Sequence, residues 1–322
     1  MDGLLIINKP AGPTSHDVVA RVRRVLGERR IGHTGTLDPL ATGVLPLVVG
    51  RATRLARFLS ASEKSYEAVI RLGISTETAD AGGTPFEPTF TGVLPSRDTL
   101  DRALNAFRGT FLQQPPVFSA KKIGGKRSHR LARGQTRVRP RVRPGSDPRS
   151  DLGQTAVGLT PAPARVSVRR LEIVGVEDDR VTLSLDCSAG FYVRSLAHDL
   201  GQAVATGAHL ERLQRTRSGD FTLADAIDLA AAERDPERAR ASVVPLASML
   251  PGLKALVLTT DGVRHAVQGR ELGPADFCRD SGFGTVDADA GLVRLLDTGG
   301  ALVGIAERAR TPGLLHPFVI LI

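Results

Sequence analysis

Residues 31–47 read IGHTGTLDPLATGVLPL, and they join a Gly- and Thr-rich loop to an apolar run. Glycines and prolines recur in its first part and predict a loop, whereas the apolar run at 44–49 predicts a buried strand. The loop carries one carboxylate, Asp38, whose backbone is restricted by Pro39. Taken alone, a Thr-Leu-Asp-Pro stretch is more typical of a turn, in which the aspartate binds its own backbone, than of a nucleophile. Both interpretations of Asp38 stay open at this point.

The segments around this stretch alternate between strand and helix periodicity. Residues 3–8 (GLLIIN) form a short apolar run that predicts a buried strand. Apolar residues between 18 and 26 fall at helical spacing, with Ser15 as the predicted N-cap and Gly27 as the predicted stop. The strand predicted at 64–72 places four side chains on one face: Tyr66, Ala68, Ile70 and Leu72.

The remaining chain divides into two predicted domains. Further helices are predicted at 51–59, from Ser96 to near Gly109, through Leu196, Leu200 and Val204, and from Thr222, with strands at 166–176 and 181–187. Past residue 251, short apolar runs separated by glycine and aspartate predict a small all-β domain. We therefore expect an α+β domain over residues 1–250 and a β domain over 251–322.

The positive charge is concentrated in one segment. The formal net charge is +9, and the thirty residues from Lys121 to Ser150 carry eleven Lys or Arg against one acid, Asp147. Such clustering favours a polyanionic partner such as nucleic acid, although a solvated run of charges is the alternative. Residues 137–164 lack periodicity and are rich in Arg, Pro, Gly and Ser, which is typical of a flexible basic insertion.

Several classes of protein are excluded by what the sequence lacks. The two cysteines, Cys187 and Cys278, lie far apart without CxxC spacing, so neither a disulfide framework nor a zinc site is predicted. His33 could be a metal ligand or a general base, but no second ligand lies at metal-binding spacing, and lone histidines are usually structural. No membrane-length apolar run and no signal peptide occur, which indicates a cytoplasmic protein.

Five sequence blocks give the chain a resemblance to a known family. They occur in this order: GLLIINKPAGPTSHDVV (3–19), IGHTGTLDPLATGVLPL (31–47), KSYEAVIRLG (64–73), QPPVFSAKKIGGKRSHRLARG (114–134) and CSAGFYVRSLAHDLG (187–201). Together they closely resemble the TruB family, bacterial synthases that make pseudouridine 55 in the T-loop of tRNA. The resemblance implies a catalytic domain of the pseudouridine synthase type, with a mixed, largely antiparallel sheet, followed by a small β-barrel PUA-like domain that binds RNA.

The resemblance assigns the chemistry to three residues. Asp38 matches the family aspartate that acts at ribose C1′ while the glycosidic bond breaks, as carboxylates do in glycoside chemistry. Arg194 matches the arginine that pairs with this aspartate, and an adjacent cation would keep Asp38 ionised. Tyr66 matches the tyrosine that stacks on the flipped uracil. Without the resemblance, Arg194 would be interpreted as a surface arginine and Tyr66 as a core residue. No cofactor and no metal are implied.

Further residues are expected to bind the substrate. His33 corresponds to the histidine that fills the space left by the flipped base, while Tyr192 and Leu213 look like pocket walls. Basic residues are expected to contact phosphates and to dominate the salt dependence of binding. These are Lys9, Lys64, Lys121, Lys122, Arg127 and Arg130.

The implied partner is the T-stem-loop of tRNA, bound by a monomer with no obligatory protein partner. Two alternatives remain. The archaeal and eukaryotic synthases that are guided by small RNAs share these motifs, but they usually carry sequence before the first strand, whereas here the motif begins at Gly3. A non-catalytic RNA chaperone would explain the basic segment and a PUA-like tail, but not the presence of Asp38, Tyr66 and Arg194 together.

Overall fold

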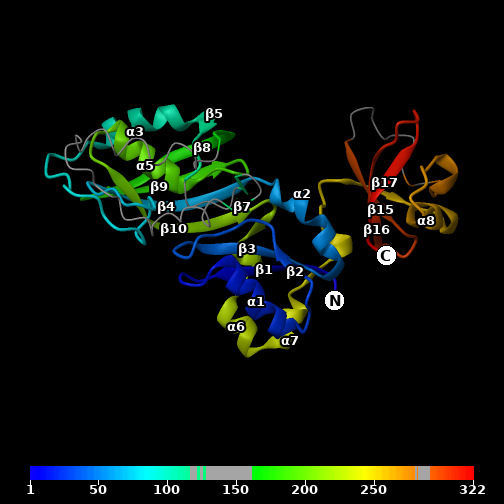
Figure 1. The fold of residues 1–322 in the computed structure, drawn as a ribbon. Coiled ribbons are helices and arrows are strands. Elements are labelled where there is room, and N and C mark those ends of the chain that lie inside the picture. Colours follow the sequence, from blue (N-terminus) through cyan, green and yellow to red (C-terminus); the bar gives the residue numbers. More distant parts are fainter. Residues whose placement is uncertain (117–121, 124–125, 128–161, 280, 282–290) are drawn as a thin grey trace, which may run out of the picture.

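The computed structural model describes residues 1–116, 122–123, 126–127, 162–279, 281 and 291–322 (Figure 1). Eleven strands form one large sheet: β1 (Gly3–Lys9), β2 (Ile31–His33), β3 (Thr42–Val49), β4 (Lys64–Leu72), β5 (Gly109–Gln113), β8 (Ala164–Glu177), β9 (Arg180–Cys187), β10 (Ala208–Ser218), β11 (Phe221–Thr222), β12 (Ile227–Asp228) and β13 (Val244–Pro245). Two further strands, β6 (Lys122–Ile123) and β7 (Lys126–Arg127), pair with each other.

The large sheet is mixed and mainly antiparallel, as predicted. Its order is β12-β1-β3-β10-β4-β9-β8-β5, with β2 beside β3, β11 beside β10 and β13 beside β1. Only the β1–β12 and β3–β10 pairs of this sheet are parallel. The β3–β10 pair matters most for the site, because it brings the strand that follows the Asp38 loop against a strand from the second half of the chain.

Five of the α-helices form two groups beside the large sheet. The α-helices are α1 (Ser15–Leu26), α2 (Ala56–Ser60), α3 (Arg97–Leu104), α5 (Val193–Ala203), α6 (Leu229–Arg234), α7 (Pro236–Ala241) and α8 (Thr260–Val267), and the 3-10 helices are η1 (Gly50–Leu55), η2 (Asn105–Phe107), η3 (Leu223–Asp225), η4 (Leu246–Ser248) and η5 (Pro274–Asp276). Helices α1, α6 and α7 pack together under β1, while α3 packs on β8, α5 packs on β10 and β4, and these two helices contact each other (Figure 1).

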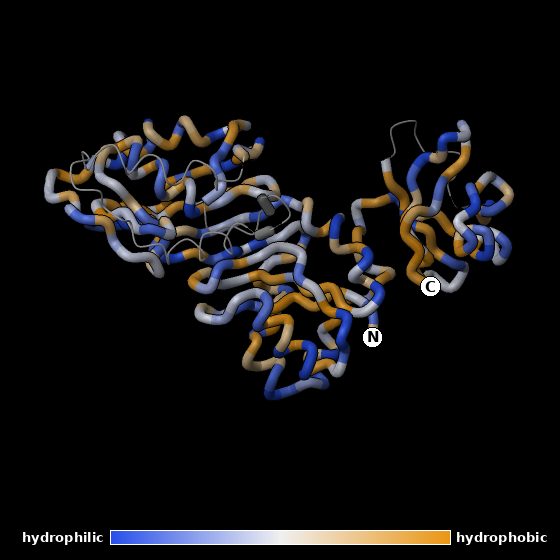
Figure 2. Tube along the Cα trace, viewed as in Figure 1, coloured by the Kyte–Doolittle hydropathy of each residue, from blue (hydrophilic) through white to orange (hydrophobic). Residues whose placement is uncertain are grey.

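Strand alternation sorts the apolar residues into separate cores. Leu5 and Ile7 belong to the core that also contains the apolar residues of α1, whereas Leu4 and Ile6 belong to a second core on the opposite face of the same strand. The tube in Figure 2 is correspondingly hydrophobic along both β1 and β3. The four residues predicted to share one face of 64–72 all lie in the first core, which confirms that prediction.

The C-terminal part contains a four-stranded sheet. Its strands are β14 (Lys254–Val257), β15 (Leu292–Leu296), β16 (Leu302–Arg308) and β17 (Leu315–Ile320), with β14 parallel to β15 and the other pairs antiparallel. Helix α8 corrects the expectation of an all-β domain. The Thr259 hydroxyl caps it by accepting from the Gly262 N–H, and Val263 and Ala266 turn one face toward the strands.

Three helix predictions differ from the structure in their N-cap, continuity or length. The N-cap of α1 is Thr14 rather than Ser15, because Thr14 and Asp17 form a reciprocal capping box. The helix predicted at 51–59 is divided into η1 and α2, and Thr222 opens only the short η3. Gly27 ends α1 in a left-handed conformation, as predicted.

Part of the predicted basic insertion, residues 137–161, lies outside the described residues. Among the helices of the described residues, none is both long and apolar enough to cross a bilayer.

Candidate active site

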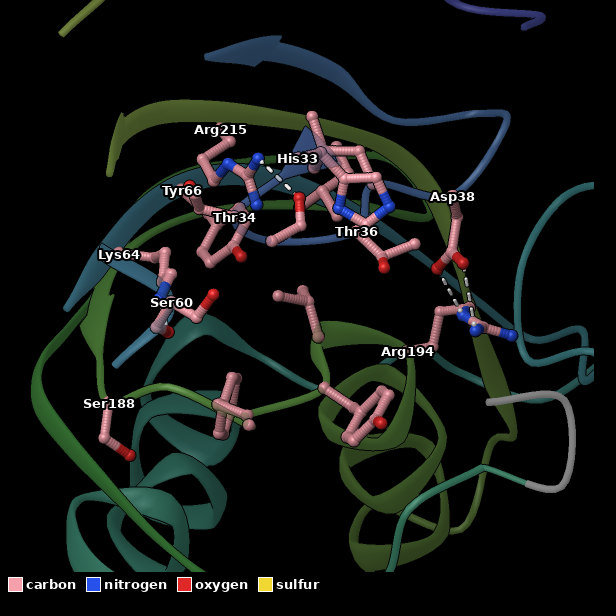
Figure 3. A pocket seen from close by; sticks show the side chains of 17 residues that line it. His33, Thr34, Thr36, Asp38, Ser60, Lys64, Tyr66, Ser188, Arg194 and Arg215 are labelled. Carbon is pink, nitrogen blue, oxygen red and sulfur yellow. Dashed lines mark hydrogen bonds and ion pairs between the residues drawn. The ribbon is translucent and has the colours of Figure 1, made fainter. Parts of the chain in front are cut away.

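A cavity of about 350 Å³ lies between the Asp38 loop, strands β4 and β10 and the start of α5 (Figure 3). Its lining brings together seven residues that the sequence analysis singled out: His33, Asp38, Lys64, Tyr66, Tyr192, Arg194 and Leu213. These residues come from distant parts of the chain, so it is the sheet order that assembles them.

Asp38 and Arg194 form an ion pair at one end of the cavity. Arg194 Nε lies 2.9 Å from Asp38 Oδ2, and Nη2 donates to Oδ1 at 3.3 Å. This two-point contact fixes the direction of the carboxylate. The side chain of Arg194 is only 6% exposed, whereas 36% of the Asp38 side chain remains accessible. Arg194 therefore holds the carboxylate, while part of the Asp38 side chain remains accessible from the cavity.

A second carboxylate, which sequence reasoning missed, lies behind Arg194. Asp80 Oδ2 is 3.8 Å from Arg194 Nε, and Arg194 Nη1 donates to the Thr78 carbonyl at 3.2 Å. Asp80 is itself held by the Thr78 hydroxyl at 2.6 Å and the Gly82 N–H at 3.0 Å. Arg194 is thus shared by two acids through its Nε, and the Thr78 carbonyl holds its guanidinium at Nη1.

The electrostatic balance at Asp38 favours protonation more than the sequence analysis expected. Burial raises the pKa of the Asp38 carboxyl above its ordinary value, and the nearby charge of Asp80 raises it further. Arg194 and Lys9 lower the pKa, as expected of adjacent cations, but they do not outweigh the loss of water. Asp38 is therefore a partly desolvated carboxylate beside a cation, an arrangement common at catalytic sites.

Lys9 braces the loop instead of facing RNA. It is fully buried, and its Nζ donates to the carbonyls of Pro10 at 2.9 Å, Pro39 at 3.3 Å and Ala41 at 2.7 Å. Burial lowers the pKa of Lys9 to about 8, and Asp38 opposes this effect. The predicted phosphate contact does not fit this geometry. Lys9 instead stabilises the turn that follows Asp38 by donating to its carbonyls.

Tyr66 and Leu213 form adjoining apolar surfaces of the cavity. Each is about nine-tenths buried, and they lie on the neighbouring strands β4 and β10. Burial raises the pKa of the Tyr66 phenol, while the charge of Arg215 opposes the shift. Tyr66 belongs both to the sheet core and to the cavity wall, so the two interpretations of this residue are compatible.

His33 and Tyr192 both line the cavity. The His33 ring makes an edge contact with His16, with ring centroids 5.2 Å apart. Tyr192 precedes α5, and its backbone exchanges two hydrogen bonds with the Gln113 side chain at 2.8 and 2.9 Å. The backbone of His33 is paired with Leu47 in β3, so both side chains are carried on anchored backbone.

Lys64 and Arg215 give the cavity a second cationic region. Lys64 Nζ donates to the carbonyls of Ser60, at 2.7 Å, and Ser62. Arg215 was missed by sequence reasoning, because an arginine on an alternating strand is usually solvent-facing. It is 1% exposed, and the β3–β10 pairing places its backbone against Gly43, where a Cβ would lie 2.2 Å from the Arg215 carbonyl oxygen.

The other predicted basic residues are not placed in the site. Lys121 and Arg130 lie outside the described residues, and the side chains of Lys122 and Arg127 in β6 and β7 are not described. In the part of the chain that the structure describes, no three His, Cys, Asp or Glu side chains gather as metal ligands would.

Comparison with known proteins identifies the family. Residues 23–146 match the N-terminal domain of TruB family pseudouridylate synthases, and residues 194–251 match the tRNA pseudouridylate synthase B C-terminal domain. The tRNA pseudouridine synthase B of Solibacter usitatus is 41% identical over 327 residues, covering all of both chains. The chain belongs to the TruB family. A Mycobacterium tRNA pseudouridine synthase B is 38% identical, covering 98% of this chain and 96% of the relative.

Solved structures of complexes that contain Cbf5 share the fold. The chain is similar to the structure titled "Crystal Structure of a Cbf5-Nop10-Gar1 Complex", with a TM-score of 0.65, 25% identity, and coverage of 95% of this chain and 78% of that one. An archaeal box H/ACA Nop10-Cbf5 complex gives a TM-score of 0.67 at 22% identity, covering 99% and 86%. These matches agree with the mixed α+β fold found here.

Proposed function

We propose that this TruB family member isomerises uridine 55 in the T-loop of tRNA to pseudouridine. The observation that carries the proposal is the Asp38–Arg194 pair, which presents an accessible carboxylate to a cavity walled by Tyr66. The volume, about 350 Å³, is near the lower end for ligand pockets and suits a single nucleotide rather than a duplex. The target uridine must therefore leave its stack to enter.

The reaction needs three things from the protein. Asp38 supplies a carboxylate at ribose C1′ as the bond to N1 breaks, either by attack or by stabilising the electron-poor carbon. Tyr66 and Leu213 supply apolar contact that offsets an unstacking cost of a few kcal/mol. Arg194 holds Asp38 in place and favours its ionised form.

Three further assignments complete the proposal. We propose that residues 251–322 act as a PUA-like RNA-binding domain, and that residues 1–250 form the catalytic domain. We propose that the enzyme works in the cytoplasm as a monomer on tRNA. Relatives named tRNA pseudouridine synthase B, at up to 41% identity, favour this over guide-RNA dependence, whereas the Cbf5 likeness in solved structures is 22–25% identical.

The direct test is the Asp38→Asn variant. With a T-loop hairpin tritiated at uracil C5, the wild-type protein should release tritium without added metal or nucleotide. Asp38→Asn should lower this rate by a factor on the order of 10³ or more, because the amide can neither attack nor carry the charge. Hairpin affinity should change little, since few binding contacts are lost.

The matched control is Asp178→Asn, the same change at an exposed turn residue with φ 50° that asparagine tolerates. It should leave tritium release unaltered. If Asp38→Asn turned over at the wild-type rate, Asp38 would have no place in the mechanism.

A further inference from the structure

Two buried cations converge at Gly35, on the side of the cavity away from Asp38. A Cβ at Gly35 would lie 3.2 Å from Arg215 Nη1 and 3.8 Å from Lys64 Cε, so the missing side chain leaves room beside both groups. Lys64 is 6% exposed and Arg215 1% exposed. Figure 3 shows these residues with Tyr66 at one end of the cavity and the Asp38–Arg194 pair at the other.

Neither cation has an acidic partner among the described residues. Arg215 donates from Nε to the Val44 carbonyl at 2.6 Å and from Nη2 to the Gly35 carbonyl at 3.1 Å. Lys64 uses two of its three ammonium donors on backbone carbonyls. Carbonyls orient these groups, but they do not neutralise two full charges.

The thiol beside Lys64 does not supply the missing negative charge. Cys187 is paired with Lys64 in the β4–β9 register, and burial raises the pKa of its thiol to about 12. It is therefore neutral at physiological pH. Burial, with Arg215 nearby, lowers the pKa of Lys64 to about 8, so Lys64 is still largely protonated at pH 7. Buried charges are rare unless something pairs with them, so the site is built for an anion.

The proposed reaction creates such an anion inside this cavity. When the N1–C1′ bond breaks, its electron pair stays on the uracil and spreads from N1 onto the O2 and O4 oxygens. The base then turns, its C5 bonds to C1′, the C5 proton leaves, and N1 takes up a proton. No oxidant or co-reactant is consumed. The negative charge exists only between the two bonding states, when stabilisation accelerates the reaction most.

We propose that Lys64 and Arg215 bind the oxygens of the detached uracil and stabilise its negative charge. This inference rests on the proposed function. Asp38 then acts on the sugar at one end of the cavity, while the two cations stabilise the base at the other. A phosphate of the substrate is the competing anion. It fits less well, because both groups lie beneath the surface beside Tyr66, where a base rather than the backbone is expected.

The first experiment measures single-turnover rates and hairpin affinity for Lys64→Met and Lys64→Arg. We expect Lys64→Met to lower the rate about 10²- to 10³-fold, as loss of one oxyanion donor does, with the dissociation constant changed less than threefold. Lys64→Arg should recover much of the rate. Arg102→Met, which removes an exposed cation on α3, should change neither quantity. A weaker affinity and shallower salt slope with an unchanged rate would instead identify a phosphate contact and overturn the inference.

The second experiment changes the leaving group. A hairpin with 5-fluorouridine at the target releases a base whose anion is stabilised by fluorine, and the rearranged fluorinated nucleoside can be quantified after one turnover. The defect of Lys64→Met should then be at least about tenfold smaller. Equal defects on both hairpins would show that Lys64 only positions the loop, which overturns the inference. Failure of the wild-type protein on both hairpins would overturn the proposed function as well.

Gly35→Ala keeps the inference testable if Lys64→Met does not fold. The new methyl group would take the space beside Arg215 Nη1 without removing either charge. The uridine rate should fall with affinity retained, and the fall should again be smaller with 5-fluorouridine. An unchanged uridine rate would overturn the inference.

Discussion

The reactivity of Asp38 is set by the charges of Arg194 and Asp80. Arg194 is shared between Asp38 and Asp80, so it stabilises the ionised form of the first acid while the second acid partly cancels its field. Together with burial, Asp80 raises the pKa of Asp38. A carboxylate that is held in place but incompletely stabilised retains more of its affinity for an electron-poor carbon.

This balance predicts the pH dependence of the rate. The ionised form of Asp38 is the active one, so the single-turnover rate should fall as the pH drops through its raised pKa. Asp80→Asn removes one of the charges that raise this pKa, and the acid limb should therefore move to lower pH. The measured quantity is the pH at which the single-turnover rate falls, and Asp178→Asn should not change it. A limb that stays in place or moves upward in Asp80→Asn would contradict this account.

At the scale of elements, the start of α1 holds the catalytic loop. Ser15, the first residue of α1, accepts from the Leu37 N–H at 2.8 Å and donates to the Leu37 carbonyl at 3.0 Å. Gly12 N–H adds a bond to the Pro39 carbonyl at 2.8 Å. Leu37, on one side of Asp38, is thus held by α1, and Pro39, on the other side, is held by the loop that precedes α1, as a positioned catalytic group requires.

Ser15→Ala should therefore affect stability and catalysis together. It leaves the buried Leu37 N–H and carbonyl without these partners, which should lower the free energy of unfolding by about 1–3 kcal/mol. The turnover number should fall because Asp38 loses its position. Thr14→Ala is the matched control, since it removes the α1 cap at a cost of about 1 kcal/mol and leaves the Leu37 contacts intact. Urea unfolding and tritium release measure both effects; an equal loss of turnover in the two variants would refute a special role for Ser15.

At the scale of the whole molecule, the C-terminal sheet shares a core with the large sheet. Leu4 of β1 and Val48 of β3 belong to the same apolar cluster as Ile305 of β16 and Val319 of β17. At this junction the Phe58 and Phe318 rings meet edge to face at 6.0 Å, and the Arg57 guanidinium lies 4.4 Å from the Phe318 ring centroid. The two parts should therefore unfold together.

Phe318→Ala should weaken this junction. Loss of the aromatic pair and the cation–π contact should lower the free energy of unfolding by roughly 1–3 kcal/mol and broaden the urea transition toward two steps. Val267→Ala removes a half-exposed side chain from α8 in the same part of the chain, and it should change stability by less than about 0.5 kcal/mol. If Phe318→Ala had the same urea unfolding transition as the wild-type protein, the ring contacts would not couple the two sheets.

The sequence by itself determined the local structure and the identity of the main chemical groups. Period-two alternation predicted β4 and the face that carries Tyr66, and helical spacing with Gly27 predicted α1 and its end, because both signals act between near neighbours in the chain. The ordered motifs singled out Asp38, Tyr66 and Arg194, residues that the fold then brings into one cavity.

The tertiary structure decided which polar groups work together. Asp38 and Arg194 are 156 residues apart, and the contacts of Asp80 with Arg194, of Lys9 with Ala41 and of Arg215 with Val44 likewise join residues that are distant in the chain. The sequence places Lys9 and Arg215 among ordinary basic residues, whereas burial makes one a brace for the loop and the other a cation facing the cavity. The physical reason is that a charge acquires its role from the water it loses and the groups it meets, and both depend on contacts distant in the chain.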